Sequence, residues 1–545
     1  MRLQHQTRVN HSGMRRVIAV GLDGYEESLG RRLIEAGELP SLARLRERSA
    51  RYLLDHGPAQ RSGLAWEHVS TGLSPERAGR WAALHFDPST YRVWQEGTRL
   101  RPFPALLKSR TVVFDAPYFD LAQAPEARGI VGWGAHDPGV AHAARPDSLL
   151  EELRARFGKY PAERWIYGVV WASVERTREM GEALAEAVRR RSRAARWLLG
   201  ERLPDWNLAL VVVSEPHSAV EGLWHGVDPT HPLHQMPSAG PAREGLLSVY
   251  RAVDRLVGEL AEAFPEATLV VFSMGGMGAN HSDTASMILL PELLYRHAFG
   301  HALLRQPGAW ADTSAPPLLG ERQDWAEAIR ANLDARRDGR FKVRRALTRI
   351  GKTLRRSSVP RPESPEESSP WRSVDWIPAT LYRPHWSAMP AFALPSYYDG
   401  RIRINLDGRE SEGCVPLSEY EAQCDRIESL LRECRDPATG CGVVEHVERV
   451  GERAPLALCE TESDVIVVWK GTFCALEHPT LGRVGPVPYR RPGGHTGPFG
   501  MAYVCNAGLK PGDRGIRSSF DVVPTLIDLL GEPTPEGLSG ASLLQ

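Results

Sequence analysis

The chain has 545 residues, and its 67 Lys plus Arg balance 67 Asp plus Glu, so the formal net charge is zero. This balance excludes a protein that is drawn as a whole to nucleic acid or to an anionic membrane surface, and we expect neither as a partner. A hydrophobic content of 42% and a charged content of 25% are typical of a globular protein. The length allows a large α/β domain with insertions.

The cysteines and the first residues bear on the compartment. None of the seven cysteines forms a C-x-x-C pair, which favours reduced thiols over a zinc ribbon or a disulfide scaffold. Residues 1–14 are polar and lack the apolar run of a signal peptide. No apolar stretch reaches the roughly 18 residues that cross a bilayer. We therefore predict a cytoplasmic protein; the sequence leaves the oligomeric state open.

Short apolar runs alternate with helix-forming segments over the first half of the chain. Buried strands are predicted at residues 16–22, 111–114, 208–213 and 268–272. Helices are predicted at residues 26–48, with a break at Gly37 and Pro40, and at residues 174–200 and 248–263. This alternation predicts an α/β fold with a doubly wound, mostly parallel sheet. Ligands of such sheets bind beyond the carboxyl ends of the strands.

The composition of the sequence and the predicted elements change in the second half of the chain. Residues 355–370 are rich in Pro, Ser and charge and predict a disordered loop. A hairpin at 396–405 and a helix at 418–434 predict a small α+β insertion over residues 371–457. We expect the strand at 465–469 to rejoin the main sheet and a helix at 520–530 to follow. The resulting division is a flexible start (1–15), a core in two parts (16–354 and 458–545), the loop and the insertion.

Candidate chemical groups lie at or soon after the predicted strand ends. Asp23 lies in Gly21-Leu22-Asp23-Gly24 and is either a metal ligand or a turn residue. Ser62 precedes a predicted helix and is either a nucleophile or an N-cap, and one residue can serve as both. His217 and Glu221 are four residues apart, a spacing that brings both side chains to one helical face. His495 lies in a Gly-rich turn, which lets the backbone approach a ligand closely.

The order of these motifs resembles the alkaline phosphatase superfamily, specifically its type I phosphodiesterase/nucleotide pyrophosphatase branch. The resemblance runs from about Arg16 to Leu544 and includes the segments at residues 37–45, 62–75 and 521–531. It implies an alkaline-phosphatase-like α/β fold with a small α+β insertion. It also implies a site in which cations flank a serine or threonine alcohol.

On this resemblance Ser62 holds the nucleophile position and Asp23 a metal-ligand position. His217 and Glu221 stand where the family has an Asp and a His, so the two ligand types have traded places, and His495 matches the family's late His. These residues are all competent ligands for a divalent cation. The family's Asp-His pair is replaced by Met274-Gly275, a soft thioether and a residue without a side chain, which predicts one metal rather than two.

We therefore predict a metal-dependent phosphoric-ester hydrolase or transferase with a Ser62 nucleophile. The cofactor is a divalent metal, with zinc the best match to a His/Glu/His set that keeps an open position. The partner is a small-molecule phosphate or other ester, whose identity the sequence leaves open. Two alternatives remain: a catalytically degenerate alkaline-phosphatase-like binding or regulatory protein, and a structural partner in a larger complex.

Overall fold

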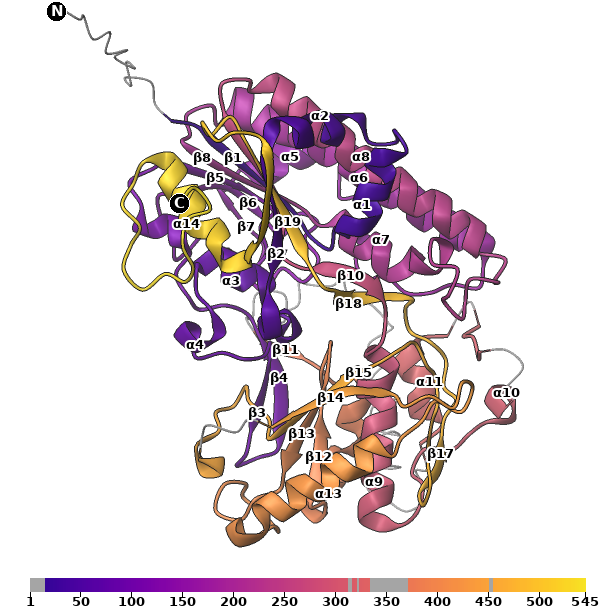
Figure 1. Cartoon of the computed structure of the whole chain (residues 1–545). Helices are drawn as coiled ribbons and strands as arrows, with labels where there is room; N and C mark the ends of the chain where they lie inside the picture. Colours follow the sequence, from indigo (N-terminus) through magenta and orange to yellow (C-terminus); the bar gives the residue numbers. More distant parts are fainter. Residues whose placement is uncertain (1–14, 312–315, 321–322, 334–370, 450–453) are drawn as a thin grey trace, which may run out of the picture.

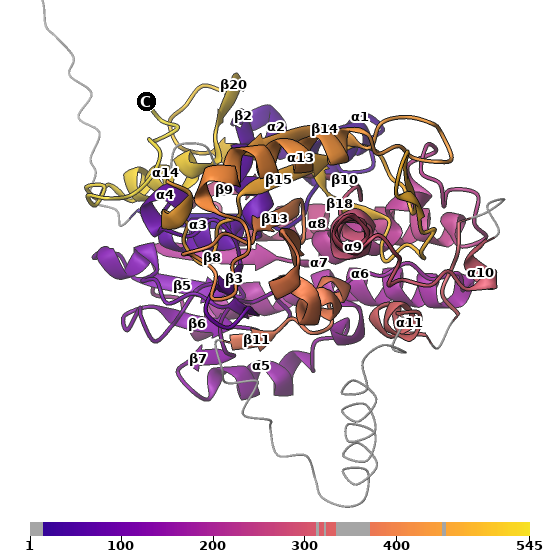
Figure 2. The same cartoon turned by 90° about the horizontal axis from the view of Figure 1, so that it is seen from below.

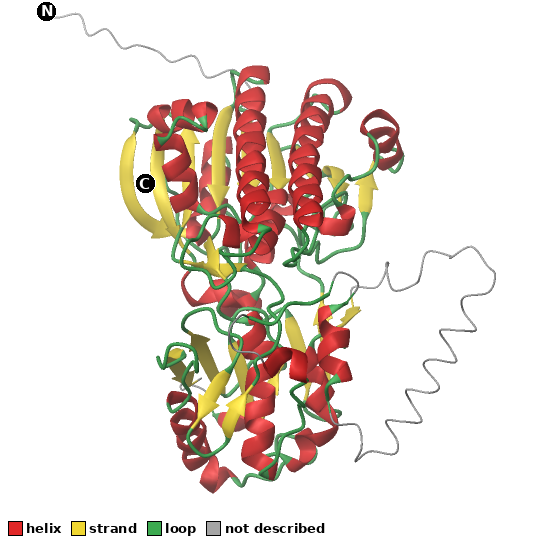
Figure 3. Cartoon of the chain, turned by 90° about the vertical axis from the view of Figure 1, so that its right-hand side faces the viewer, coloured by secondary structure: helices red, strands yellow, loops and turns green. Residues whose placement is uncertain are grey.

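The computed structural model describes residues 15–311, 316–320, 323–333, 371–449 and 454–545. The flexible start predicted for residues 1–15, except Arg15, and the disordered loop predicted for residues 355–370 lie outside the described residues. The chain folds into a larger lobe around a wide sheet and a smaller lobe below it (Figures 1 and 3).

A nine-stranded sheet forms the centre of the larger lobe in the described part of the chain. Its strands in spatial order are β20 (Gly512–Ser518), β2 (Ser49–Asp55), β19 (Gly500–Cys505), β9 (Thr268–Ser273), β1 (Val17–Leu22), β8 (Leu208–Val213), β5 (Thr111–Phe114), β6 (Arg128–Val131) and β7 (Ala143–Arg145). The run from β9 to β6 is parallel, whereas β19 and β7 are antiparallel to their neighbours. The mostly parallel sheet predicted from the sequence is confirmed.

Both faces of the sheet are covered, as its strand composition requires. Along β1, Ile18 and Val20 belong to one hydrophobic core, and Val17 and Ala19 belong to a second core on the opposite face. The first core includes the long helices α6 (Val174–Trp197) and α8 (Ala239–Ala263). The second includes residues of α3 (Ala65–Thr71) and α14 (Val522–Leu530). The other helices of this lobe are α1 (Glu27–Glu35), α2 (Pro40–Arg48), α4 (Pro75–Ala78), α5 (Leu149–Phe157) and α7 (Glu215–Leu223).

The smaller lobe has its own core, drawn from residues 84–91, 285–329 and 374–487. Its four-stranded antiparallel sheet has the order β12 (Ala391–Leu394), β13 (Gly400–Ile404), β15 (Val465–Trp469) and β14 (Val444–Arg449). Figure 2 looks from this lobe toward the larger one and shows α13 (Tyr420–Arg432) and β15 in front of the main sheet. The other elements of the lobe are β3 (Leu84–Asp87), β4 (Arg92–Glu96), β11 (Trp371–Ser373), α9 (Leu290–Phe299), α10 (Gly308–Ala311), α11 (Trp325–Ala331), β16 (Leu476–His478) and β17 (Gly482–Val484).

One strand prediction is wrong. The strand at 465–469 was expected in the main sheet, but β15 pairs with β13 and β14 of the smaller sheet. An apolar run shows that a strand is buried without showing against which sheet, because either core covers it equally well. The predicted hairpin is present, although its first strand, β12, begins upstream of the expected segment.

The helix that follows β8 is held between two long neighbours. α7 packs against both α6 and α8. These two helices meet at Gly181 and Gly245, where a Cβ added to Gly181 would lie 2.4 Å from the Cα of Gly245. Met180 of α6 in turn covers Gly222 of α7. The backbone position of α7 therefore depends on two helices that touch without side chains between them.

No helix among the described residues combines the length and the apolar character that a membrane crossing needs.

We expect Gly181→Ala to lower the free energy of unfolding by about 2 kcal/mol, because its methyl group must push α6 away from α8. Gly240→Ala, in the partner helix α8, has nothing within 4 Å of the added Cβ and is the matched control. The control is expected to leave stability unchanged or slightly raised, since Ala favours a helix over Gly. Urea unfolding of the three proteins measures the difference. Equal midpoints for Gly181→Ala and wild type would contradict the close helix contact.

Candidate active site

Asp23 follows β1 directly and lies between two glycines that the packing requires. A Cβ on Gly21 would lie 2.4 Å from the Trp66 ring. Gly24 has φ +64°, and a Cβ on it would lie 2.4 Å from the Cα of His217. The glycines therefore let Trp66 and His217 close in on either side of the Asp23 carboxylate.

His217 and Glu221 come from α7, which begins directly after β8 and is buried along its whole length. His217 Nδ1 lies 3.1 Å from Oδ2 of Asp23, and its Nε2 lies 3.3 Å from Oε1 of Glu221. The spacing of four residues therefore brings both side chains to one helical face, as predicted. The carboxyl ends of the adjacent strands β1 and β8 meet here and bring Asp23 to His217.

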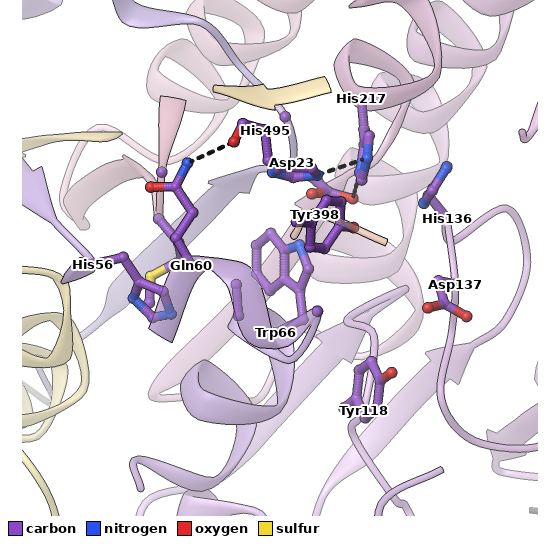
Figure 4. A pocket seen from close by; sticks show the side chains of 15 residues that line it. Asp23, His56, Gln60, Trp66, Tyr118, His136, Asp137, His217, Tyr398 and His495 are labelled. Atoms are coloured by element: carbon purple, nitrogen blue, oxygen red, sulfur yellow. Dashed lines mark hydrogen bonds and ion pairs between the residues drawn. The ribbon is translucent and has the colours of Figure 1, made fainter. Parts of the chain in front are cut away.

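Two more imidazoles complete the cluster (Figure 4). His495 of β18 (Gly493–Gly497), which pairs with β10 (Gly276–Ala279), has its Nε2 3.0 Å from Nε2 of His217. His136, in the connection between β6 and β7, stacks on His217 with ring centroids 3.8 Å apart. Its Nε2 lies 3.2 Å from Oε2 of Glu221. The sequence analysis did not identify His136, because it lies in none of the motifs on which the resemblance rests.

The protonation states of these groups suit cation binding. Burial acts to raise the pKa of Asp23, but the neighbouring His217 outweighs it, and the net pKa lies below the usual value. Burial, with His217 nearby, lowers the pKa of His136 and of His495 well below the usual value. At neutral pH the pocket therefore holds an ionised carboxylate beside neutral imidazoles, the forms that bind metal ions.

Asp23, His136 and His217 offer one ligand atom each, and these three atoms lie within 4.8 Å of one another. A carboxylate oxygen with two imidazole nitrogens is a donor set that divalent zinc accepts. All three residues are buried. The residues present therefore fit a divalent cation, with His495 next to His217.

Glu221 has partners on both of its oxygens. Oε1 is paired with the guanidinium of Arg491 as well as with His217, and Oε2 accepts from His136 and from the amide of Gly168. Arg491 also pairs with Asp283 through Nε at 2.6 Å, and burial lowers the pKa of Arg491 to about 9. Glu221 therefore lies within the cluster as predicted, but its contacts are those of a residue that orients imidazoles.

The positions that correspond to the family's second metal pair, Met274 and Gly275, carry no carboxylate or imidazole. Met274 is 6% exposed and belongs to the core that contains Trp66. A Cβ on Gly275 would lie 3.2 Å from Cδ of Gln60. The Gln60 amide donates to the carbonyls of His495 and Gly497 at 3.4 and 3.1 Å. Gln60 thus fills the space beside Gly275.

Ser62 lies at the edge of the cluster. It ends the short 3-10 helix η1 (Gly57–Ser62), and its neighbours Gly63 and Ala65 line the pocket together with Asp23 and His217. Its Oγ donates to the carbonyl of Ala59 at 2.7 Å and accepts from the amide of Leu64 at 3.1 Å. Ser62 itself is not among the lining residues, so the hydroxyl does not face the pocket in this structure.

A buried arginine fixes the two connections that carry His136 and His217. Arg191 of α6 donates to Oδ2 of Asp115 at 2.7 Å and to Oε1 of Glu215 at 2.9 Å. Asp115 ends β5 and accepts from the amides of Trp133 and Gly134, just ahead of His136. Glu215 begins α7 two residues before His217. The connections that carry His136 and His217 are therefore attached to one guanidinium.

The type I phosphodiesterase/nucleotide pyrophosphatase family model matches residues 17–390. The chain belongs to this family. Its members are phosphodiesterases and pyrophosphatases, so the protein is an ester hydrolase of the alkaline phosphatase superfamily. The resemblance, the fold class and the enzyme class predicted from the sequence are thereby confirmed.

Comparison with solved structures gives distant similarity over the whole chain. The alkaline phosphatase PafA aligns with a TM-score of 0.52 at 10% identity, covering 97% of this chain and 98% of that one, and supports the fold. Phosphonoacetate hydrolase from Sinorhizobium meliloti aligns at 0.48 with 16% identity over 95% of each chain. Murine ectonucleotide pyrophosphatase/phosphodiesterase 5 aligns at 0.46 with 12% identity over 97% and 98%. No curated protein matches the sequence.

We expect Arg191→Met to lower the free energy of unfolding by about 3–5 kcal/mol, because Asp115 and Glu215 become buried carboxylates without a cation. The control is Arg193→Ala on the exposed side of the same helix, which should change stability by less than about 0.5 kcal/mol. Denaturant unfolding at neutral pH checks both values. If Arg191→Met lowers the free energy of unfolding by no more than the control does, the Arg191 network does not stabilise the site.

Proposed function

We propose that the protein is a phosphoric-ester hydrolase or transferase with one divalent cation held by Asp23, His136 and His217. Zinc is the preferred cation. The observation that carries the proposal is the buried set of three donor atoms within 4.8 Å of one another at the strand ends. His495 adjoins this set through His217, and Glu221 orients the imidazoles of His217 and His136. This assignment adds His136 to the residues predicted from the sequence.

The charges around the cluster support a cation. The carboxylates of Asp23, Glu221 and Asp283 face two guanidiniums, Arg490 and Arg491, which pair with Glu221 and Asp283. The imidazoles of His136 and His495 are neutral and do not compensate the negative charge of Asp23, which contacts His217. The Asp23 carboxylate would repel a phosphate ester. A bound divalent cation would reverse the sign of the site, polarise a phosphoryl oxygen and neutralise charge that develops on it.

A single cation is favoured over two. Met274 is packed into a hydrophobic core and Gln60 occupies the space beside Gly275, so neither position of the family's Asp-His pair can supply a ligand. Asp23, a member of that second site in the resemblance, contacts His217 instead.

Ser62 is the proposed nucleophile. Its backbone lies next to the pocket-lining residues Gly63 and Ala65, and its Oγ is held by a carbonyl and an amide of its own loop. Attack on a phosphoryl group requires Oγ to exchange its hydrogen bond with Ala59 for contact with the substrate, and its proton to pass to a base. Trp66 and Tyr398 border the same pocket and restrict water around the reacting group.

The competing proposal is a degenerate binding or regulatory protein on this scaffold. The inward-turned hydroxyl of Ser62 and the salt bridge between Glu221 and Arg491 are the observations that favour it. Metal content and turnover separate the two.

A cytoplasmic location belongs to the proposal as well. It is supported by the seven cysteines, all of which are free thiols in the structure.

The purified chain is expected to bind about one zinc or other divalent ion, because the donor set serves a single centre. His217→Ala should abolish tight binding and phosphoesterase activity, since His217 contacts every other member of the cluster. The matched control is His446→Ala, a half-exposed histidine of the smaller lobe, which should retain both. Elemental analysis with a chelator titration gives the stoichiometry. A metal-free protein that hydrolyses no ester would favour the binding protein instead.

Replacing Ser62 by Ala should lower kcat by about a thousandfold while the bound metal stays, because the nucleophile is lost and the cation centre is intact. Ser70→Ala is the control: its hydroxyl donates to the carbonyl of Pro117 from α3, away from the pocket. Steady-state rates on a panel of phosphomonoesters and diesters, with metal analysis of each variant, are the measurement. Unchanged turnover in Ser62→Ala would remove the serine from the mechanism.

A further inference from the structure

A large chamber adjoins the pocket that holds the cation ligands. It has a volume of about 660 Å³, and His136, Asp137 and Tyr398 line both spaces. Its wall combines parts of residues 136–137 and 164–171 of the larger lobe with Leu319, residues 323–326, parts of residues 372–376 and residues 397–398 of the smaller one, and with Arg490 and Arg491. An ester bound with its phosphoryl group at Asp23 would direct its alcohol part into this chamber.

The size of the chamber indicates a bulky alcohol part. Binding sites for whole small molecules commonly have volumes of about 300–1,000 Å³. If the substrate were a phosphoryl group alone, most of the chamber would stay filled with water. The release of that water could then contribute nothing to the affinity for the substrate.

Aromatic side chains provide flat apolar surfaces in the wall. These are Tyr167, Trp171, Trp325, Trp376, Tyr397 and Tyr398. Tyr167 and Trp376 remain 46% and 37% exposed, so they have surface left for a ligand. The Arg490 guanidinium lies over the Trp376 ring at 4.7 Å and keeps the indole in place.

The charges of the wall are balanced. Its four guanidiniums, on Arg164, Arg372, Arg490 and Arg491, are equal in number to the wall carboxylates Asp137 and Asp324 together with Asp283 and Glu221, which pair with the last two arginines. Arg372 lies 3.7 Å from Asp137, whereas Arg164 lies over the Trp165 ring and Asp324 accepts from the amide of Glu327. A second anionic group on the substrate would gain no net attraction from this wall, and at Arg372, Arg490 or Arg491 it would have to displace a carboxylate, which costs the desolvation of both.

The same pairs present donors next to acceptors. Arg372 beside Asp137 offers N–H groups and carboxylate oxygens side by side, and Gln95 donates to Asp137 at 3.0 Å. A hydroxyl group both donates and accepts, so it fits such a pair without disturbing the charge balance. The faces of a sugar ring carry C–H bonds that pack on aromatic rings, and its rim carries hydroxyls.

We propose that this chamber binds the alcohol part of the substrate, and that this part is a neutral, hydroxylated ring of the carbohydrate class. The inference rests on the proposed function, because it assumes that the phosphoryl group binds at Asp23 and His217. It narrows the substrate class to phosphate esters of sugars that carry no nucleobase.

The test is calorimetric titration of the metal-loaded, full-length Ser62→Ala protein, in which turnover is suppressed. The probes are inorganic phosphate, the phosphates of glucose, galactose, mannose and N-acetylglucosamine, adenosine monophosphate and 4-nitrophenyl phosphate. At least one sugar phosphate is expected to bind about tenfold more tightly than inorganic phosphate. The proposal is overturned if the gain goes to adenosine monophosphate or 4-nitrophenyl phosphate instead, or if no probe exceeds inorganic phosphate.

Two variants locate the binding. Trp376→Ala should remove the gain for the sugar phosphate and leave the affinity for inorganic phosphate unchanged, and Trp376→Phe should restore part of it. Leu417→Ala, an exposed apolar residue elsewhere on the smaller lobe, is the control and should change neither. A gain that survives in Trp376→Ala contradicts the assignment of the chamber.

The failure of the two proposals can be told apart with phosphate-free methyl glycosides. His217→Ala removes the cation centre and should leave saturable glycoside binding in place. If the protein binds glycosides but holds no metal and hydrolyses no ester, the proposed function is wrong and the proposal that the chamber binds a sugar stands. If phosphate esters are hydrolysed at rates that do not depend on the alcohol part, and no glycoside binds, the proposal that the chamber binds a sugar is wrong and the proposed function stands.

Discussion

The buried guanidinium of Arg191 is the constraint on which the rest of the site depends. It has no exposed surface and joins Asp115, at the end of β5, to Glu215, at the start of α7. Asp115 adopts φ 62°, a left-handed backbone conformation. Its carboxylate accepts hydrogen bonds from two backbone amides of the connection that leads to His136. Because a buried ion pair tolerates little displacement of either partner, the strand ends, the connection and α7 are fixed together. This network therefore sets the distance between the imidazoles of His136 and His217.

The exchange of ligand types on α7 has a physical consequence beyond the loss of a motif. With Glu221 in place of an imidazole, a carboxylate enters a pocket that already holds Asp23, and two close carboxylates repel each other unless a cation separates them. Arg491 supplies that cation and is itself held by Asp283. The protein thus neutralises Glu221 with a fixed charge. On the proposed function, Asp23 and the imidazoles are left for one exchangeable cation, where the resemblance implies two.

Prediction from the sequence succeeded where a residue is fixed by its own strand. Asp23 and His217 follow apolar runs whose parallel pairing brings their ends together, and the runs are visible in the sequence. His136 was missed because its place in the cluster comes from the stacking of its ring on His217 and from the bonds of Asp115 to the loop, which no spacing reveals. The strand β15 was assigned to the wrong sheet because its composition reports burial and not the identity of its partner. Ser62 was aligned with the nucleophile position of the motif, and the sequence could not give the direction of its hydroxyl, which local hydrogen bonds with Ala59 and Leu64 decide.

The two lobes divide the work of such an enzyme. The strand ends of the larger lobe carry every proposed cation ligand, whereas the smaller lobe reaches the pocket through Tyr398, whose ring meets His495 edge to face at 4.4 Å. Trp376 and Tyr397 continue this wall outward into the chamber. We therefore expect substitutions in the smaller lobe to change the alcohol part of the substrate without moving His136 or His217, since Arg191 holds the two connections that carry them through Asp115 and Glu215. A rigid centre combined with an independently built wall is how one fold can keep its chemistry while its substrates diverge.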